Sequence, residues 1–263
     1  MSKINLENYI SDLQKNGRSH FIRSEALKAC QMSNSSFQAA LRELSKKGML
    51  LSPKKEFYAI VPPEYKDRPL PPEHYIDQLM NHLNKTYYVG CLSAAAIHGA
   101  AHQQPMEFQV ITKGPLRNIE LNGIRILFSS KKNISDIPTE KIKTKTGFMN
   151  VSTKEVTVCD LVKYVEKSGY LDNVVNTIIE ISKDLRARKL GSVSKHFETT
   201  VLQRLGYLID TYSGEDELTR FIHEEVERRE PQFIPLAIYS KQKDGKMNEK
   251  WKIKVNEVVE ADV

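Results

Sequence analysis

Residues 33–61 read SNSSFQAALRELSKKGMLLSPKKEFYAIV, and they decide the fold of the N-terminal part of the chain. Phe37, Ala40, Leu41 and Leu44 recur at the i, i+3, i+4, i+7 spacing of an amphipathic helix. Gly48 stops that helix. Two short apolar runs, 49–52 and 57–61, then flank Pro53-Lys54-Lys55-Glu56. A helix followed by a hairpin with a basic tip predicts the recognition helix and the wing of a winged helix.

The residues before this stretch supply the elements that such a fold needs. A first helix is predicted to end at Asn16-Gly17, because both residues tolerate the left-handed conformation. Residues 20–22 are a short extended stretch, Ser24 resembles the N-cap of a second helix, and residues 31–33 form the turn into the third. The apolar residues of the first two helices are Ile4, Leu6, Tyr9, Ile10, Leu13, Ala26, Leu27 and Cys30. The order predicts an N-terminal winged helix-turn-helix.

Positive charge is concentrated in this part of the chain. Residues 1–70 hold 12 Lys or Arg against 7 Asp or Glu, a net charge of +5, whereas the remaining 193 residues hold 27 against 26, a net charge of +1. A basic excess confined to one small unit is typical of a module that binds phosphates. Double-stranded DNA is therefore the first partner to test.

If Phe37 and Leu41 face inward, the opposite face of the third helix carries Ser35, Ala39, Arg42 and Lys46, with Gln38 at its edge. Gln38 is suited to read adenine, and Arg42 to read guanine or hold a phosphate. The predicted groove-facing residues are Ser35, Ser36, Gln38, Arg42 and Lys46, and the predicted backbone-positioning residues are Arg18, Arg23, Lys28, Lys54 and Lys55. The alternative is a solvated helix face on a winged helix that docks a protein.

A proline-rich segment follows the winged helix. Residues 62–72 contain five prolines in eleven positions, which favours a stiff, extended spacer. A chain of 263 residues has room for one or two domains. The predicted division is a winged-helix domain over 1–61, a linker over 62–72 and a second domain over 73–263.

The second domain is predicted to be α+β, with a small sheet and a helical bundle. Asn122-Gly123 is a strong hairpin signal between two expected strands. The expected strands are 108–112, 117–121 and 124–128, within a sheet over about 87–130, and a late strand pair within about 233–255. The expected helices are 74–83, 91–98, 156–167, 171–185, 193–208 and 216–228, of which the last four lie within about 153–228. The basic runs 141–145 and 183–189 are expected to be solvated.

Several classes of protein are disfavoured by composition. No apolar run reaches the roughly 20 residues that span a bilayer, and Met1-Ser2-Lys3 leads into an amphipathic helix instead of a signal peptide, so a cytoplasmic protein without membrane contact is expected. Cys30, Cys91 and Cys159 are odd in number and widely spaced, which predicts buried thiols and no disulfide framework.

Catalytic motifs are weak. His98 and His102 are four residues apart, but Gly99 and Pro105 weaken the helix that a metal site there would need. Ser93 and His98 have neither a glycine-framed elbow nor a placed acid, and no Gly-Lys-Ser or Gly-Lys-Thr phosphate loop is present. Asp160, Glu166 and Lys167 faintly resemble a nuclease triad on a predicted helix. We expect no catalytic residue, metal or cofactor.

Several motifs, taken in their order along the chain, resemble those of a known family. Residues 87–99, YYVGCLSAAAIHG, are followed by Phe108-Gln109-Val110 and by a basic hairpin through Arg117 and Arg125. Residues 157–161, TVCDL, and 204–208, RLGYL, follow in order. Together with the winged helix they resemble the AbiEi antitoxins of the AbiE abortive-infection systems of phage defence, over essentially the whole chain. One departure is Glu56-Phe57 before Tyr58, where many members carry an Arg-Gly pair, so contacts by the wing are less secure than contacts by the helix.

The resemblance implies a type IV antitoxin and transcriptional autorepressor. It would bind inverted repeats in its own operon promoter, with self-association or cooperative binding on DNA, and oppose a nucleotidyltransferase toxin encoded next to it without needing a stable complex. The alternative is a one-component winged-helix regulator whose second domain senses a ligand. A nuclease is a third class, and metal-dependent cleavage of DNA would reveal it.

Overall fold

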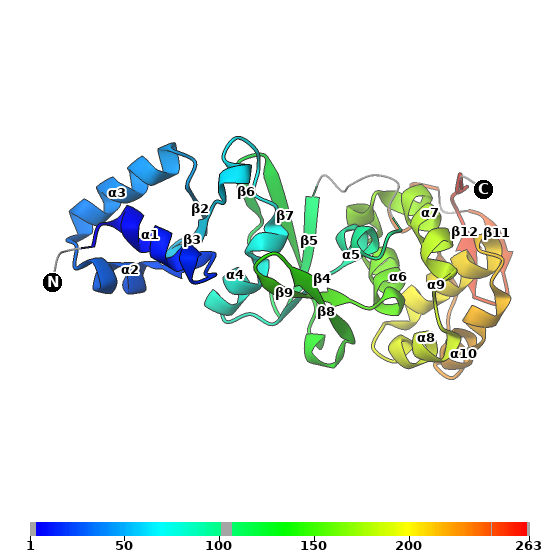
Figure 1. Ribbon diagram of the computed structural model, residues 1–263. Coiled ribbons are helices and arrows are strands. Elements are labelled where there is room, and N and C mark those ends of the chain that lie inside the picture. The colour runs from blue at the N-terminus through cyan, green and yellow to red at the C-terminus, as the bar shows by residue number, and fades with distance from the viewer. Residues whose placement is uncertain (1–3, 101–106, 243, 262–263) are drawn as a thin grey trace.

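The computed structural model describes residues 4–100, 107–242 and 244–261. The molecule is elongated, and its parts follow one another in chain order (Figure 1). A small helical unit with a three-stranded sheet lies at the N-terminal end, a six-stranded sheet lies in the middle, and helices α6–α10, which lie between residues 154 and 227, are at the C-terminal end. The fold is α+β.

The N-terminal unit is a winged helix-turn-helix. Its elements are α1 (Leu6–Lys15), β1 (His20–Ile22), α2 (Arg23–Cys30), α3 (Asn34–Lys46), β2 (Leu50–Lys54) and β3 (Phe57–Ile60). The antiparallel sheet has the order β1-β3-β2. Phe21 and Phe37 are fully buried between this sheet and the helices, together with Leu6 and Ile10 of α1. This element order and packing are consistent with the winged helix predicted from the sequence.

The wing differs in detail from the sequence prediction. Strand β2 continues to Lys54 through an irregularity between Leu51 and Lys54, so the turn itself is Lys55-Glu56. Glu56 adopts the left-handed conformation with φ of 69°. The Ser52 hydroxyl donates to the carbonyl oxygens of Lys54 and Phe57 at 3.2 and 3.1 Å, which satisfies backbone acceptors where the strand pairing is interrupted.

The proline-rich segment is folded against the second part of the chain instead of being an extended spacer. It contains the 3-10 turns η1 (Pro63–Tyr65) and η2 (Pro72–His74), each with proline at its start, where a missing amide hydrogen costs nothing. Leu70 and Pro72 are buried. The Tyr65 ring lies 4.5 Å from the Arg68 guanidinium and 4.9 Å from the His74 ring.

The central sheet has the order β6-β7-β5-β4-β9-β8. Its strands are β4 (Tyr87–Val89), β5 (Glu107–Thr112), β6 (Ile119–Leu121), β7 (Ile124–Ser130), β8 (Thr139–Thr144) and β9 (Gly147–Ser152). The pairs β5–β7 and β4–β9 are parallel, and the other three are antiparallel. The last two strands lie beyond the sheet that the sequence predicted, and the basic run 141–145 overlaps β8 and the turn after it, with its lysines exposed.

The two faces of this sheet pack against different parts of the molecule. One face, with Tyr87, Val89 and Val110, packs with α4 (Ile76–His82) and with Leu51 and Phe57 of the wing strands. The other face, with Tyr88 and Ile111, packs with α5 (Cys91–Ile97) and the helices that follow. The sheet therefore separates the winged helix from the C-terminal helices (Figure 1).

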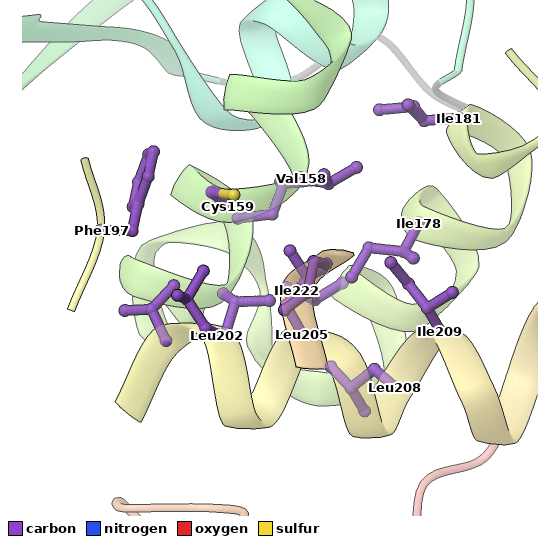
Figure 2. Packing of buried hydrophobic residues seen from close by; sticks show 14 of the residues in the cluster. Val158, Cys159, Ile178, Ile181, Phe197, Leu202, Leu205, Leu208, Ile209 and Ile222 are labelled. Atoms are coloured by element: carbon purple, nitrogen blue, oxygen red, sulfur yellow. The ribbon is translucent and has the colours of Figure 1, made fainter. Parts of the chain in front are cut away.

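The C-terminal part is a helical bundle with a small three-stranded sheet. Its elements are η3 (Ile134–Asp136), α6 (Lys154–Lys163), η4 (Val165–Ser168), α7 (Tyr170–Ser182), α8 (Ala187–Ser194), α9 (Thr199–Tyr212), α10 (Asp216–Glu227), β10 (Ile234–Pro235), β11 (Lys246–Asn248) and β12 (Ile253–Val255). The predicted helix 193–208 is in fact the end of α8 and most of α9, and the late strands number three within the described residues. Figure 2 shows Leu202, Leu205 and Ile209 of α9 packing among side chains of α6, α7 and α10.

The state of the cysteines and the hydropathy of the helices were also predicted from the sequence. Cys30, Cys91 and Cys159 are buried free thiols, as expected. None of the helices in the described ranges is long and apolar enough to span a bilayer.

Candidate nucleic-acid interface

The N-terminus of α3 is held by a serine cluster. The Ser33 hydroxyl accepts from the Ser36 amide at 3.2 Å and caps the helix. It also lies 3.0 Å from the Ser35 hydroxyl and 2.9 Å from that of Ser36. Residues 34–36 are exposed. The first turn of α3 is therefore an ordered polar surface, and this is the part of a recognition helix that contacts base edges in helix-turn-helix proteins.

Replacing Ser33 by alanine is expected to destabilise the protein by about 1 kcal/mol, because the first turn of α3 loses its side-chain cap. Urea unfolding followed by circular dichroism measures the change. Ser45→Ala is the control, since Ser45 lies exposed near the other end of α3 and has no capping role. Equal stability of the two variants would contradict a stabilising cap.

One face of α3 is exposed along its whole length. Phe37, Leu41 and Leu44 are buried beneath the helix. The side chains of Ser35, Ser36, Ala39, Arg42 and Lys46 are exposed and Gln38 is half-buried. The described residues offer no ion pair to Arg42 or Lys46. Small side chains at 35 and 39 allow close approach of a partner, and two cations are available to bind it.

Two of the predicted phosphate-binding arginines have local partners instead. Arg23 donates to Asn34 Oδ1 at 3.1 Å, lies 3.8 Å from Glu56 Oε1, and stacks over the Phe37 ring at 5.6 Å. It thus joins α2, the start of α3 and the wing. Arg18 forms an ion pair with Glu25 at 2.9 Å.

The predicted positioning lysines also differ in whether they have a partner within the protein. Lys54 Nζ donates to the main-chain oxygen of Arg117 at 3.2 Å, so the wing contacts the loop that leads into β6. Lys28 and Lys55 are exposed on α2 and at the wing turn. Of the predicted positioning residues, these two are the ones with freely exposed side chains.

The winged helix packs against the rest of the molecule through its wing strands. The buried ring of Phe57 stacks on His20 at 5.5 Å and lies 5.6 Å from the ring of His82, at the end of α4. Leu51 and Ala59 join the same buried cluster as Leu70 and residues of α4. The α3 face is therefore presented in a fixed orientation relative to the central sheet.

The weak catalytic candidates have main-chain partners. Ser93 Oγ accepts from the Gln109 amide at 2.9 Å and donates to the Glu107 carbonyl at 3.2 Å. His98 Nε2 lies 2.7 Å from the Ser152 carbonyl oxygen. His102 and Pro105 lie outside the described residues, among which no group of three potential metal ligands was found. Ser93 and His98 therefore support the chain around β5 and β9.

The second part of the chain has a known relative at family level. Residues 88–211 match the family model of the AbiEi antitoxin C-terminal domain. Residues 88–211 therefore belong to the AbiEi antitoxin family. Among solved structures, it is similar to the RV2827C protein from Mycobacterium tuberculosis, with a TM-score of 0.67 and 15% sequence identity over 94% of this chain and 89% of that one. At that identity the likeness concerns the fold alone. No curated protein matches the chain.

In this part of the chain, one matched motif builds a buried charge cluster between sheet and helices. Asp160 of α6 is fully buried, accepts from the Tyr88 hydroxyl at 2.8 Å, and lies 3.6 Å from Lys131 Nζ. Lys131 Nζ lies 3.3 Å from the centre of the Phe197 ring. Burial raises the pKa of Asp160 and lowers the pKa of Lys131. Lys131 was not predicted from the sequence as a buried residue, because Lys131-Lys132 has the composition of a solvated pair.

The Arg-Leu-Gly-Tyr motif at residues 204–207 also has a structural role. Arg204 donates to main-chain oxygens of Thr200, Pro235 and Leu236 and thereby ties α9 to β10. A Cβ atom at position 206 would lie 2.2 Å from the ring of Trp251, which is fully buried, so only glycine allows this approach. The motif thus attaches the small C-terminal sheet to the bundle.

Proposed function

We propose that this AbiEi antitoxin represses its own operon by binding inverted repeats in the promoter through its winged helix. The observation that carries the proposal is the exposed α3 face with Ser35, Ala39, Arg42 and Lys46, on a winged helix attached to an antitoxin domain. Small and cationic side chains on a helix of this kind suit the major groove. Inverted repeats imply two copies of the chain on DNA, by self-association or by cooperative binding.

The antitoxin activity is proposed to oppose a nucleotidyltransferase toxin encoded next to it. The match over residues 88–211 supports an antitoxin role for the second part of the chain, and the nature of the toxin rests on the family resemblance. Antagonism need not involve a stable complex. Both activities are proposed to take place in the cytoplasm.

Binding of the full chain to its own promoter should weaken steeply with salt. About six phosphate contacts predict a loss in affinity of order 10³-fold between 50 and 200 mM salt, because bound counterions are released from the DNA. Fluorescence anisotropy with the promoter and with a scrambled duplex measures both affinity and specificity. A salt-insensitive complex, or equal affinity for the scrambled duplex at every salt concentration, would contradict the proposal.

Substitutions can separate base reading from positioning on the backbone. Gln38→Ala or Arg42→Ala should relax discrimination at one or two base pairs by about 1 to 3 kcal/mol each. Lys55→Ala should weaken all duplexes alike, since its exposed side chain lies on the wing turn. Binding-site selection with each variant checks this, and the reverse pattern would mean that the wing reads the bases.

A further inference from the structure

A cavity of ≈400 Å³ lies where α6 ends and α9 begins, away from the winged helix. This volume is within the roughly 300–1,000 Å³ of small-molecule pockets. Its polar wall includes Lys163, Lys167, Thr200 and Arg204, and its apolar wall includes Val165, Leu236 and Ile238. Ile238 has an apolar side chain, yet 65% of its surface is exposed. The cavity thus combines a cationic side with an uncovered apolar side.

Arg204 is a buried cation without an acidic partner among the described residues. It is only 8% exposed, and its hydrogen bonds go to main-chain oxygens: Nε to Leu236 at 3.0 Å, Nη2 to Pro235 at 3.0 Å and Nη1 to Thr200 at 3.3 Å. Burial with no neighbouring carboxylate lowers the pKa of Arg204 to about 10. Each Nη atom keeps a second hydrogen that these bonds do not use. Buried charges in proteins are normally paired, so this one favours an anion in the cavity.

The start of α9, where Glu198, Thr200 and Val201 line the cavity, adds donors beside this wall. The first amides bonded to the Glu198 carbonyl are those of Val201 and Leu202, at 3.0 and 3.2 Å, and Glu198 provides no side-chain cap. In the described part of the chain the amides of Thr199 and Thr200 have no hydrogen-bond acceptor. This end of a 14-residue helix carries partial positive charge and unpaired donors.

Two lysines complete the cationic side. Lys163 forms an ion pair with Glu198, and Lys167 Nζ donates to Ser129 Oγ at 2.8 Å. With Arg204 they make three cations, against the carboxylates of Glu166 and Glu198 on the same wall. The balance is positive even after the internal ion pair is counted.

We propose that this cavity binds a small molecule that carries a phosphate group and an apolar part. The guanidinium of Arg204, the α9 amides and the lysine side chains are the donor types that proteins use for phosphate. The apolar part would cover Leu236 and Ile238. The site lies outside the α3 face, so this proposal does not depend on whether the protein binds DNA.

The test is calorimetric titration of the full chain with phenyl phosphate, inorganic phosphate and phenol at matched ionic strength. Phenyl phosphate is expected to bind with a dissociation constant below about 1 mM and more tightly than inorganic phosphate, because it uses both walls. Phenol is expected not to bind. Lack of phenyl phosphate binding, or equal binding of phenol, would overturn the proposal.

Variants locate the binding. Thr200→Asp places a carboxylate in the first turn of α9, where it is favourable for the helix, so the melting temperature should be unchanged or higher while phenyl phosphate binding is lost. Lys167→Gln should weaken binding at least about tenfold, because a charge-assisted contact is removed. Lys183→Gln is the charge-matched control, since Lys183 is exposed outside the cavity. Unchanged binding by Thr200→Asp, or an equal loss in Lys183→Gln, would place the ligand elsewhere and refute the site.

Discussion

Lys131→Met is expected to lower the free energy of unfolding by about 3–5 kcal/mol, because it leaves the fully buried carboxylate of Asp160 without its cation. Methionine retains much of the apolar stem, so the loss reports the missing charge more than a cavity. Urea unfolding at pH 8 measures it. Lys132→Met is the matched control, since Lys132 is the next residue along the chain and is exposed.

A double variant separates the cost of an unpaired charge from the value of the pair. Asp160→Asn with Lys131→Met should recover much of the stability that the single variant loses, because neither buried charge remains and the new side-chain amide oxygen can still accept from the Tyr88 hydroxyl. If the double variant were no more stable than Lys131→Met, the unpaired Asp160 carboxylate would not be the cause of the loss, contrary to our expectation. The difference between the wild-type protein and the double variant measures the net value of the pair.

The pH dependence of the Lys131→Met loss follows from the pKa of Asp160. Burial raises this pKa in the folded protein, so the folded state binds more protons than the unfolded chain between the two pKa values. The stability contributed by protonation is therefore present below the unfolded pKa of about 3.9 and is lost as pH rises through the folded pKa. Removing Lys131 raises that pKa further. The destabilisation should thus be smaller at pH 5 than at pH 8, and a loss independent of pH would show that Asp160 is not its source.

The winged helix was predictable from sequence because its signals are local. Phe37, Leu41 and Leu44 are spaced by the helix period, and all three are buried. The central sheet was predicted only in part. Strands β8 and β9 join it at an edge, and β8 carries alternating lysines that have the composition of a solvated run. The break between α8 and α9 was missed because apolar residues continue at Val193, Phe197 and Val201, so the period alone does not reveal the turn.

In the candidate interface, too, the local features were predictable from the sequence and the long-range contacts were not. Exposure of Ser35, Arg42 and Lys46 follows from the helix period, and the structure agrees. The partners of Arg23 and Lys54 depend on Glu56 of the wing and on the Arg117 carbonyl, which is 63 residues away along the chain from Lys54. The packing of Leu51 and Phe57 against α4 is equally non-local. Charge counting identifies a basic unit, but only the fold shows which cations are already engaged.

The packing of the wing strands against α4 also decides how the proposed operator binding should be tested separately from the proposed antitoxin activity. Deleting residues 1–61 would remove Leu51, Phe57 and Ala59 from the cluster that buries Leu70 and Tyr75, so failure of such a fragment could arise from exposed apolar surface alone. A single substitution on the exposed face of α3 avoids this problem. Ala39 is suited to it, because its side chain is exposed midway along the helix.

Ala39→Glu is expected to weaken operator binding by at least about 100-fold, because a carboxylate in the groove faces the phosphate backbone and like charges brought together cost several kcal/mol. Repression of a promoter–reporter fusion should be lost. Protection from the toxin, with antitoxin and toxin expressed from independent promoters, should persist, since α6–α10 lie at the opposite end of the molecule (Figure 1). Thr211→Glu adds the same charge at an exposed position of α9 and should leave repression intact. If Ala39→Glu is folded, abundant and unable to repress, yet also gives no protection, then antitoxicity requires the DNA-binding face and the two activities are not separable.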